Sequence, residues 1–340
     1  MERKFNPVEK NLFMSLEDIL IIEDTPISAQ YSVDNIEKAI KESGAHIDGR
    51  LSNLLPNQIG FNEDKRTYIA LLSESTAVVN IFPNKKHASV YISTCGSPNP
   101  INSIEAFIYL FRPRTAKVRV FTSSSLDSAF KGYLTTNEEI FWQEFDEQKV
   151  PYFYEAKNKE RERNGIYFDL ISQCALQKPK RMNGPCDNEI DVMVSMYGVK
   201  KDEIIKFYQT FSKENLERII TVDGKELVGL MAKAFPPLAR EERLSGFSYI
   251  AELKEGAFAI HITPEQNYVS FYYSLFSEKV PYKAVNKILE IFLPAYVEAR
   301  VFGTKQIKQI NRKELSPEYV VRNAEKYHKE FYIDLLRKGE

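Results

Sequence analysis

Leu71-Leu72-Ser73-Glu74-Ser75-Thr76-Ala77-Val78 places one carboxylate and three hydroxyls between two apolar segments. Tyr68-Ile69-Ala70 leads into this stretch, and Val78-Val79-Asn80-Ile81-Phe82 leads out of it. Segments rich in Val, Ile and Tyr on both sides predict two strands that meet at a polar turn. A third segment of the same kind follows at 88–94, after a turn at Pro83-Asn84-Lys85-Lys86. The stretch therefore predicts neighbouring strands of one sheet, with hydroxyls where two of them meet.

Strand and helix patterns alternate along the rest of the chain. Apolar or alternating segments predict strands at 19–22, 118–121, 165–171, 190–196, 247–251, 258–263, 268–275 and 295–302. Helical periodicity predicts helices at 32–40, 101–111, 137–145, 201–211, 222–234 and 281–293, with a lysine-rich helical tail from Ser316. The run of mixed charge at 157–163 predicts a solvated hairpin or loop. Strand clusters with helices between them predict antiparallel-rich sheets covered by helices.

The chain shows neither a linker nor a low-complexity segment, so we expect a single domain over residues 1–340. Two portions share one order, in which strands precede a polar strand end and a helix that opens at a proline. The polar strand ends are Thr94-Cys95-Gly96 and Thr263-Pro264-Glu265. This shared order indicates duplicated halves.

Composition argues against several classes of function. A net charge of −1 over 340 residues lacks the basic excess that nucleic acids and anionic membrane surfaces attract. Cys95, Cys174 and Cys186 are too few and too scattered for a disulfide framework or a zinc site. No apolar run approaches the roughly 20 residues of a membrane span, and no signal-peptide segment follows Met1-Glu2-Arg3-Lys4. We expect a cytoplasmic protein with neither nucleic-acid nor membrane partners, and no metal.

Three motifs in order carry a resemblance. Leu72-Ser73-Glu74-Ser75 comes first, then Thr94-Cys95-Gly96, and then Gly246-Phe247-Ser248 with Ile260-His261-Ile262-Thr263-Pro264-Glu265. Together they resemble the self-processing, pyruvoyl-dependent S-adenosylmethionine decarboxylases of the eukaryotic type, over most of the chain. The resemblance implies an α+β fold, a four-layer α-β-β-α sandwich with two central, mainly antiparallel sheets.

The resemblance implies that the chain cuts itself between Glu74 and Ser75 into chains 1–74 and 75–340. The Ser75 hydroxyl reaches the Glu74 carbonyl through a five-membered ring, and elimination from the resulting ester leaves a pyruvoyl group derived from Ser75. The family pattern makes His261 the base for that elimination, while Ser248 stabilises the intermediate. The ketone then condenses with the substrate amine and acts as an electron sink, and Cys95 is the implied proton donor after CO₂ leaves. The product would supply the aminopropyl group for spermidine synthesis.

Recognition of the substrate departs from the family pattern. Phe5 and Glu9 align with an aromatic residue and a carboxylate of the family's N-terminal motif, but Asn6 stands where another carboxylate is expected. Glu242 stands where a second aromatic ring would complete the adenine sandwich. Without this second ring the adenine base loses a stacking contact, and stacking is worth about 1–3 kcal/mol per base. Glu265 keeps the ribose-contacting position, and Glu74 is assigned to the substrate site as well as to the cleavage site.

The family's buried acidic site, where putrescine activates some members, is half present. Asp187 and Asp191 fit two of its carboxylates, whereas Phe13 and Tyr272 replace two others and Ser93 stands in place of a lysine. These replacements make putrescine activation doubtful. The three histidines without a motif are expected on the surface: His46, His87 and His328.

Three functions remain open. The leading one is decarboxylation of S-adenosylmethionine, an amino-acid-type small molecule, by a carboxy-lyase whose processed chains could pair as a homodimer. A second keeps the pyruvoyl group but acts on ornithine or arginine, because Glu241 or Glu242 would pair with a distal cation. A third is a non-catalytic paralogue that regulates an active decarboxylase, although a regulator has no need of Ser75, Cys95, Ser248 and His261. An unrelated structural α+β protein would require all three motifs to coincide by chance.

Overall fold

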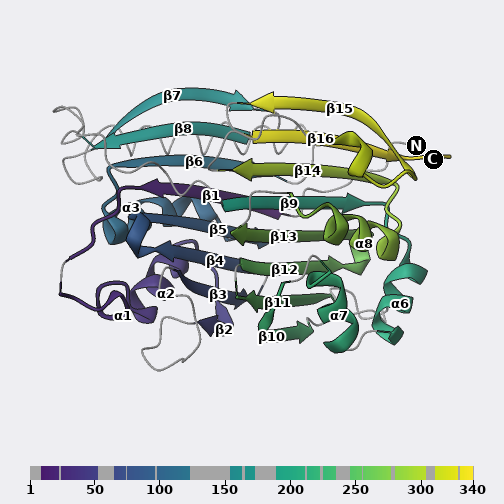
Figure 1. Cartoon of the computed structure of the whole chain (residues 1–340), viewed down its shortest axis with the longest axis horizontal. Coiled ribbons are helices and arrows are strands. Elements are labelled where there is room, and N and C mark those ends of the chain that lie inside the picture. The colour runs from purple at the N-terminus through teal and green to yellow at the C-terminus, as the bar shows by residue number, and fades with distance from the viewer. Residues whose placement is uncertain are drawn as a thin grey trace. The chain divides into compact units, whose positions relative to one another are not determined.

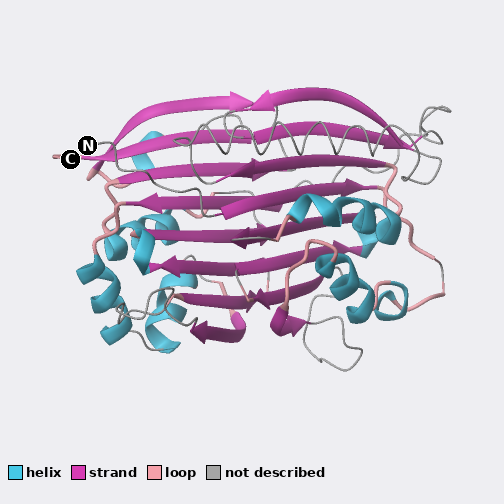
Figure 2. Ribbon diagram, turned by 180° about the vertical axis from the view of Figure 1, so that it is seen from behind, coloured by secondary structure: helices cyan, strands magenta, loops and turns pink. Residues whose placement is uncertain are grey.

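The structure is a computed structural model, and it describes residues 9–22, 24–52, 65–73, 75–95, 98–122, 154–162, 165–172, 189–210, 213–222, 225–234, 246–254, 256–276, 280–303, 311–327 and 330–339. The chain divides into two compact units, Met1–Pro185 and Cys186–Glu340. Each unit builds one antiparallel sheet and one set of helices (Figures 1 and 2). The units are described separately below.

The first unit contains a sheet of eight described strands in the order β2-β3-β4-β5-β1-β6-β8-β7. The strands are β1 Glu9–Glu17, β2 Ile47–Ser52, β3 Arg66–Leu72, β4 Ser75–Phe82, β5 His87–Cys95, β6 Thr115–Thr122, β7 Tyr154–Glu162 and β8 Gly165–Ser172. The helices are α1 Ile27–Gln30, α2 Val33–Lys41 and α3 Ser103–Phe111, with short 3₁₀ turns η1 Pro83–Lys85 and η2 Pro100–Asn102. Every pairing in this sheet is antiparallel.

The second unit contains another eight-stranded sheet among its described residues, in the order β10-β11-β12-β13-β9-β14-β16-β15. The strands are β9 Glu189–Tyr197, β10 Leu227–Ala234, β11 Phe247–Leu253, β12 Gly256–Thr263, β13 Tyr268–Phe276, β14 Tyr296–Gly303, β15 Tyr319–Tyr327 and β16 Glu330–Arg337. The helices are α6 Lys201–Thr210, α7 Lys213–Ile220 and α8 Tyr282–Phe292, with 3₁₀ turns η3 Pro264–Gln266 and η4 Arg312–Glu314. The two units thus supply the two helical layers and two antiparallel sheets of the predicted α+β fold.

The two strand orders are the same when each strand of the first unit is matched to the strand eight numbers later. The match extends to turns, since η1 follows β4 and η3 follows β12, each ending at a left-handed residue (Lys86 or Asn267). This element order makes Phe82-Pro83-Asn84 the counterpart of Thr263-Pro264-Glu265, rather than Thr94-Cys95-Gly96. The identical orders support duplicated halves, which stay a prediction.

One face of each sheet carries the apolar core beneath the helices. In the first unit, Ser32 caps α2 by accepting a hydrogen bond from the Asn35 amide, as its sequence position predicts. Ile36 and Ile40 of α2 and Phe107 of α3 are fully buried in the cluster that includes strand residues of β1, β3, β4 and β5. Burying a side chain of this size stabilises the fold by about 1.5–3 kcal/mol. The helices therefore fix which face of the sheet is apolar.

The opposite face of each sheet is also buried but carries polar side chains. Strand residues alternate between faces, so polar residues at every second position line up across neighbouring strands. In the first unit such a row contains Thr67, Asn80 and Ser89, and in the second it contains Ser248, His261 and Ser270. All six are buried. In the second unit this alignment places Ser248 opposite His261.

Several predicted elements are wrong, and packing explains each difference. Residues 9–17, for which no strand was predicted, form the central strand β1, which pairs with β5 on one side and β6 on the other. Residues 19–22 form no strand, and Leu20 and Ile22 are exposed. Residues 227–234 form edge strand β10 instead of a helix, and the C-terminal tail forms strands β15 and β16. In residues 227–234 and in the C-terminal tail, hydrogen bonds to neighbouring strands override local helical periodicity.

Two smaller predictions have mixed outcomes. The mixed-charge run at 157–163 lies largely in β7, where it forms an edge strand paired with β8, and charge on an edge strand disfavours pairing with other chains. His46 is exposed as predicted, but His87 is buried against the ring of Phe82. The helix predicted at 137–145 lies outside the described residues, as does His328.

Glu17 offers a test of the first sheet's stability. It accepts hydrogen bonds from Lys117 and from Thr115, at 3.1 Å, on the neighbouring strand β6. Burial raises the pKa of Glu17, but the charge and hydrogen bond of Lys117, together with Thr115, lower it further than burial raises it. The folded state therefore gains stability from this carboxylate above its unfolded pKa of about 4.3 and loses that gain as the pH falls through the lower folded pKa.

We expect Glu17→Gln to lower the free energy of unfolding by about 1 kcal/mol at pH 7, because a charge-assisted hydrogen bond is lost. Thermal unfolding followed between pH 7 and pH 3 measures the effect. The difference between wild type and variant should shrink as the pH falls below about 4. A difference that stays constant over this range would mean that the charge of Glu17 adds nothing.

Candidate active site

Three predicted site residues meet at one end of the first sheet. Ser75 begins β4, and Cys95 ends the adjacent strand β5. Glu9 begins β1 and pairs directly with Cys95 in the β1–β5 ladder. The Ser75 hydroxyl donates to the Glu9 carboxylate over 3.4 Å between Oγ and Oε1. The fold therefore gathers residues that lie 20 and 66 positions from Ser75 in the sequence.

The environment of these residues suits nucleophilic chemistry. Ser75 and Glu9 are each 1% exposed, so their contact is shielded from bulk water. A buried carboxylate at hydrogen-bond distance from a serine hydroxyl is placed to accept the proton that the hydroxyl loses when it attacks a carbonyl. Cys95 carries a reduced, half-buried thiol next to this pair. The first unit thus brings a buried serine hydroxyl, a buried carboxylate and a half-buried thiol together at one end of its sheet.

Tyr91 and Asn11 line the same polar face and were not singled out by the sequence. The Tyr91 hydroxyl donates to the Asn11 side-chain oxygen at 2.9 Å. Burial raises the pKa of Tyr91 well above its usual value, and the nearby Glu9 and Cys95 raise it further, while a hydrogen bond with Ser93 acts in the opposite sense. Tyr91 therefore stays a neutral phenol beside the site. Its position four residues before Cys95 on the same strand is the sequence signal that could have indicated it.

The second unit brings together Ser248 and His261. They stand opposite each other in the β11–β12 ladder, and Ser248 Oγ lies 2.6 Å from His261 Nδ1. Ser248 is fully buried and His261 is 8% exposed. A histidine fixed by one ring nitrogen presents the other in a set direction, as a general base requires. The predicted processing pair is thus formed within one unit.

The row of polar residues continues behind His261. Ser270 faces His261 across the ladder, and Ser195 faces Ser270 on the next strand. The Tyr268 hydroxyl donates to Ser195 Oγ at 3.1 Å. In the first unit the counterpart of the Ser248–His261 contact joins Thr67 Oγ1 to the side-chain oxygen of Asn80 at 3.0 Å.

The matched positions differ in chemistry between the units. Asn80 cannot act as a base near neutral pH, so only the second unit supplies a histidine at this point of its sheet. Conversely, Gly256 occupies the position of Ser75, and a Cβ there would lie 2.0 Å from the carbonyl oxygen of Ser274. A serine does not fit at 256 without a backbone shift. At these matched positions the serine is therefore confined to the first unit and the histidine to the second.

Glu265 lies in η3, directly after β12, and is half-buried. Burial raises the pKa of Tyr208 on α6, and the charges of Tyr249 and Glu265 raise it further, which places Glu265 near that ring.

Of the acidic-site residues, Asp191 accepts a hydrogen bond from the buried Tyr272 hydroxyl. That carboxylate already has a phenol as partner within its own unit.

Other parts of the predicted site lie outside the described residues: Phe5, Asn6, Glu74, Asp187, Glu241 and Glu242.

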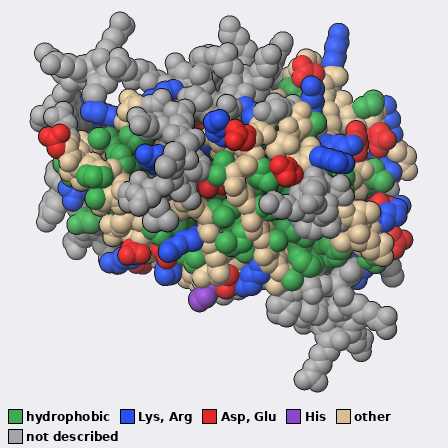
Figure 3. Space-filling model, turned by 60° about the horizontal axis from the view of Figure 1, so that its bottom comes forward, with side chains coloured by type: hydrophobic (Ala, Val, Ile, Leu, Met, Phe, Trp, Pro, Cys, Tyr) green, Lys and Arg blue, Asp and Glu red, His purple; other side chains and the backbone are tan. Residues whose placement is uncertain are grey.

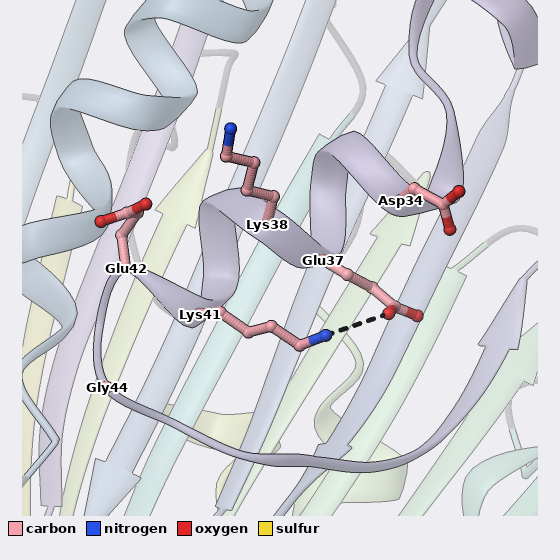
Figure 4. Close-up of a pocket in the computed structure, with 6 residues that line it drawn as sticks. All are labelled: Asp34, Glu37, Lys38, Lys41, Glu42 and Gly44. Atoms are coloured by element: carbon pink, nitrogen blue, oxygen red, sulfur yellow. Dashed lines mark ion pairs between the residues drawn. The ribbon is translucent and has the colours of Figure 1, made fainter.

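Two hollows near α2 belong neither to the Ser75–Glu9–Cys95 group nor to the Ser248–His261 pair. One, of about 500 Å³, is lined by charged side chains, among them the Glu37–Lys41 ion pair (Figure 4). The other, of about 740 Å³, lies between α2, α3 and Leu20. Neither hollow is lined by Ser75 or Glu9.

The described residues show no further candidate site in their surface charge or in clusters of metal-binding side chains. Basic and acidic side chains are interspersed on the face shown in Figure 3, with apolar and other polar side chains between them. Across the described ranges, no three His, Cys, Asp or Glu side chains lie where they could hold a metal ion. None of the helices that the structure describes is both long and apolar enough to span a membrane.

Comparison with known proteins gives the family. A sequence model of adenosylmethionine decarboxylase matches residues 58–334. This chain therefore belongs to the adenosylmethionine decarboxylase family, which is a family of carboxy-lyases. No curated protein matches the chain in a sequence search. Among solved structures, the chain is similar to the AdoMetDC-delta26 monomer of Trypanosoma brucei, with 13% identity, a TM-score of 0.48, and coverage of 74% of this chain and 96% of that one.

Proposed function

We propose that this chain is a self-processing decarboxylase whose pyruvoyl group is made from Ser75. The observation that carries the proposal is the buried hydrogen bond from the Ser75 hydroxyl to the Glu9 carboxylate, beside Cys95. A core serine with no reaction to perform does not need a buried carboxylate as its partner. Burying a carboxylate costs free energy, and buried titratable groups of this kind gather at functional sites. Both points support a functional role for the Ser75–Glu9 contact.

Self-cleavage uses the chain's own residues. The Ser75 hydroxyl passes its proton to Glu9 and attacks the carbonyl carbon of Glu74, forming a five-membered ring. The C–N bond then breaks, the nitrogen gains a proton, and residues 1–74 are held as an ester on Ser75 Oγ. The family resemblance assigns the next step to His261, which Ser248 holds: the α-proton of Ser75 is removed, and chain 1–74 leaves with a new C-terminal carboxylate at residue 74. Dehydroalanine is left at position 75, and water replaces its nitrogen, which leaves as ammonia, to give the pyruvoyl group.

The residues around position 75 fit that group. Ser75 lies at a strand start with its side chain buried, and the half-buried thiol of Cys95 lies on the next strand. When formed, the pyruvoyl group supplies an electron sink for loss of CO₂ from an α-amino acid. Cys95 delivers the proton that replaces CO₂, while Glu9 remains a hydrogen-bond acceptor for the substrate's amine.

The substrate that we propose is S-adenosylmethionine, so that the product supplies an aminopropyl group for spermidine synthesis. Family membership and the retained Glu265 support this choice. The substitutions at Asn6 and Glu242 keep ornithine or arginine as the competing substrates. Putrescine activation is not part of the proposal, because Asp191 is already engaged by Tyr272 and Ser93 replaces the expected lysine.

The test begins with the intact mass of the purified full-length protein. Two chains, 1–74 and a larger one without a free N-terminal amine, are the expected result. Release of CO₂ is then measured with S-adenosylmethionine, ornithine, arginine and lysine side by side. Activity confined to a basic amino acid would overturn the substrate assignment. A single uncut chain would overturn the enzyme proposal and favour the regulatory paralogue.

A further inference from the structure

The strand next to the predicted cleavage turn contains a β-bulge at Asp48. Ile47 of β2 pairs with Leu72 of β3, but Gly49 pairs with Leu71, so Asp48 is an extra residue in the ladder. A bulge turns the side chain of the extra residue out of the regular alternation and is common beside active sites. Here the bulge lies opposite the end of β3, just before Ser73.

Asp48 uses this position to hold Ser73. The Ser73 hydroxyl donates to Asp48 Oδ2 at 2.7 Å, and the Ser73 amide donates to the His46 carbonyl at 2.9 Å. The Asp48 side chain keeps only 18% of its area exposed, and its other oxygen lies 3.3 Å from His46 Nδ1. A hydrogen bond to a carboxylate is about twice as strong as one between neutral groups. Ser73 is therefore held through both its backbone and its side chain.

The second unit supplies an internal comparison. Its ladder between β10 and β11 has the same bulge, with Leu227 opposite Leu253 and Gly229 opposite Glu252. The backbone bond recurs too, since the Lys254 amide donates to the Glu226 carbonyl at 2.9 Å.

The side chains of the second unit do not repeat the contact. Val228 occupies the bulge and is 41% exposed, while Lys254 stands in place of Ser73. The valine shows that the bulge and its backbone bond form without a carboxylate at the bulge position, although the neighbouring Glu226 carboxylate accepts a hydrogen bond from Lys254 Nζ at 2.9 Å. The acid–hydroxyl contact occurs only in the unit where a serine, and not Gly256, begins the next strand.

We propose that Asp48 is a positioning residue for self-cleavage, acting through Ser73. This inference rests on the proposed function. Ser75 is fixed on one side of the bond to be cut by its pairing with Thr94, and Ser73 is fixed on the other side by Asp48. Attack through a five-membered ring requires the carbonyl between them to face the Ser75 hydroxyl. Holding both flanking residues restricts the turn to fewer conformations and so favours attack.

The experiment follows splitting of newly synthesised full-length chains over time by intact mass, for Asp48→Ala, Ser73→Ala and the double variant. Asp48→Val copies the residue of the second unit, Asp48→Asn keeps the shape and one acceptor oxygen, and Val228→Ala is the matched control. Thermal unfolding is recorded for each variant. Release of CO₂ is expressed per large chain with a blocked N-terminus, which separates splitting from turnover.

We expect Asp48→Ala, Asp48→Val and Ser73→Ala each to slow splitting about tenfold, and Asp48→Asn to have a smaller effect. The double variant should be no slower than Asp48→Ala alone, because both changes remove one interaction. Turnover per blocked chain and the splitting of Val228→Ala should match wild type. A general loss of packing would instead lower the unfolding temperature of each variant. The slowing of splitting in the double variant would then equal the product of the two single effects.

Each outcome decides the inference. Splitting of Asp48→Ala at the wild-type rate overturns it while leaving the proposed function intact. If Asp48→Ala and Ser73→Ala slow splitting independently, so that their effects on the rate multiply, the two residues do not act through one contact. That result overturns the inference. A wild-type chain that stays whole overturns the proposed function and this inference together.

Discussion

Ser75→Ala should leave the chain whole, with no detectable splitting and no release of CO₂. Alanine lacks the hydroxyl that attacks the Glu74 carbonyl, and neither Glu9 nor His261 can replace it as the nucleophile in a five-membered ring. The rate of splitting should fall to that of an ordinary peptide bond. Intact mass after prolonged incubation measures the effect, and it should show one chain with a free N-terminus.

Ser89→Ala is the matched control for this experiment. Ser89 is a buried serine of the same sheet whose hydroxyl contacts Asn80 at 3.4 Å, and we place it outside the cleavage chemistry. It should split as wild type does, with at most a small loss of stability from one hydrogen bond, about 1 kcal/mol. Splitting that persists in Ser75→Ala would place the cleavage at another residue and remove the assignment of the pyruvoyl group to position 75.

Cys95→Ala should split normally but turn over about 10²–10⁴-fold more slowly, because a positioned proton donor contributes a factor of that size. Cys95 ends β5 opposite Glu9, next to the strand that starts at Ser75. In the proposed function its thiol supplies a proton and takes no part in the attack on the Glu74 carbonyl. The measurement is CO₂ release per large chain with a blocked N-terminus.

Cys174→Ala is the control, since it removes a cysteine that belongs to no motif. It should split and turn over as wild type does. Wild-type turnover by Cys95→Ala would mean that another group supplies the proton. A chain that fails to split when Cys95 is replaced would move this residue from turnover to self-cleavage, and the division of roles proposed above would be wrong.

The strands near the motifs were predictable because their sequences are locally consistent. Residues 67–72, 77–82 and 88–94 are rich in β-branched and aromatic residues and lie within short turns of each other, so local pattern and final pairing agree. Helices α2, α3 and α8 were predictable for the same reason, since each has one apolar stripe that packs on a sheet.

Strands β1, β10, β15 and β16 were not predictable in this way. Two of them pair with strands that are not their neighbours in the sequence: β1 pairs with β5 and β6, and β16 pairs with β14. Residues 227–234 have a sequence that is compatible with a helix, and the hydrogen bonds offered by β11 decide their conformation. Only the assembled sheet supplies those bonds.

The catalytic residue types could be named from the sequence, because each chemical step requires a particular group. Ser75, Cys95, Ser248 and His261 stand in recognisable motifs. The supporting residues could not be named, because Tyr91, Asn11 and Asp48 carry no motif and matter only through a contact with a residue on another strand. Asp48 in particular depends on a bulge, which shifts one side chain out of the strand's alternation and has no signature in this sequence.

The family resemblance, and with it the proposed nucleophile and its proposed chemistry, therefore came from the sequence alone, because these depend on residue types in motifs that follow in a set order. The tertiary structure alone decided that the Glu9 carboxylate accepts the hydrogen bond of Ser75, and that Asp48 holds the residue before the cleavage turn. It also decided that a serine fits at position 75 but not at its counterpart, Gly256. The physical reason is that sheet register brings distant residues within a few ångströms, and register is fixed by hydrogen bonds and burial over the whole sheet.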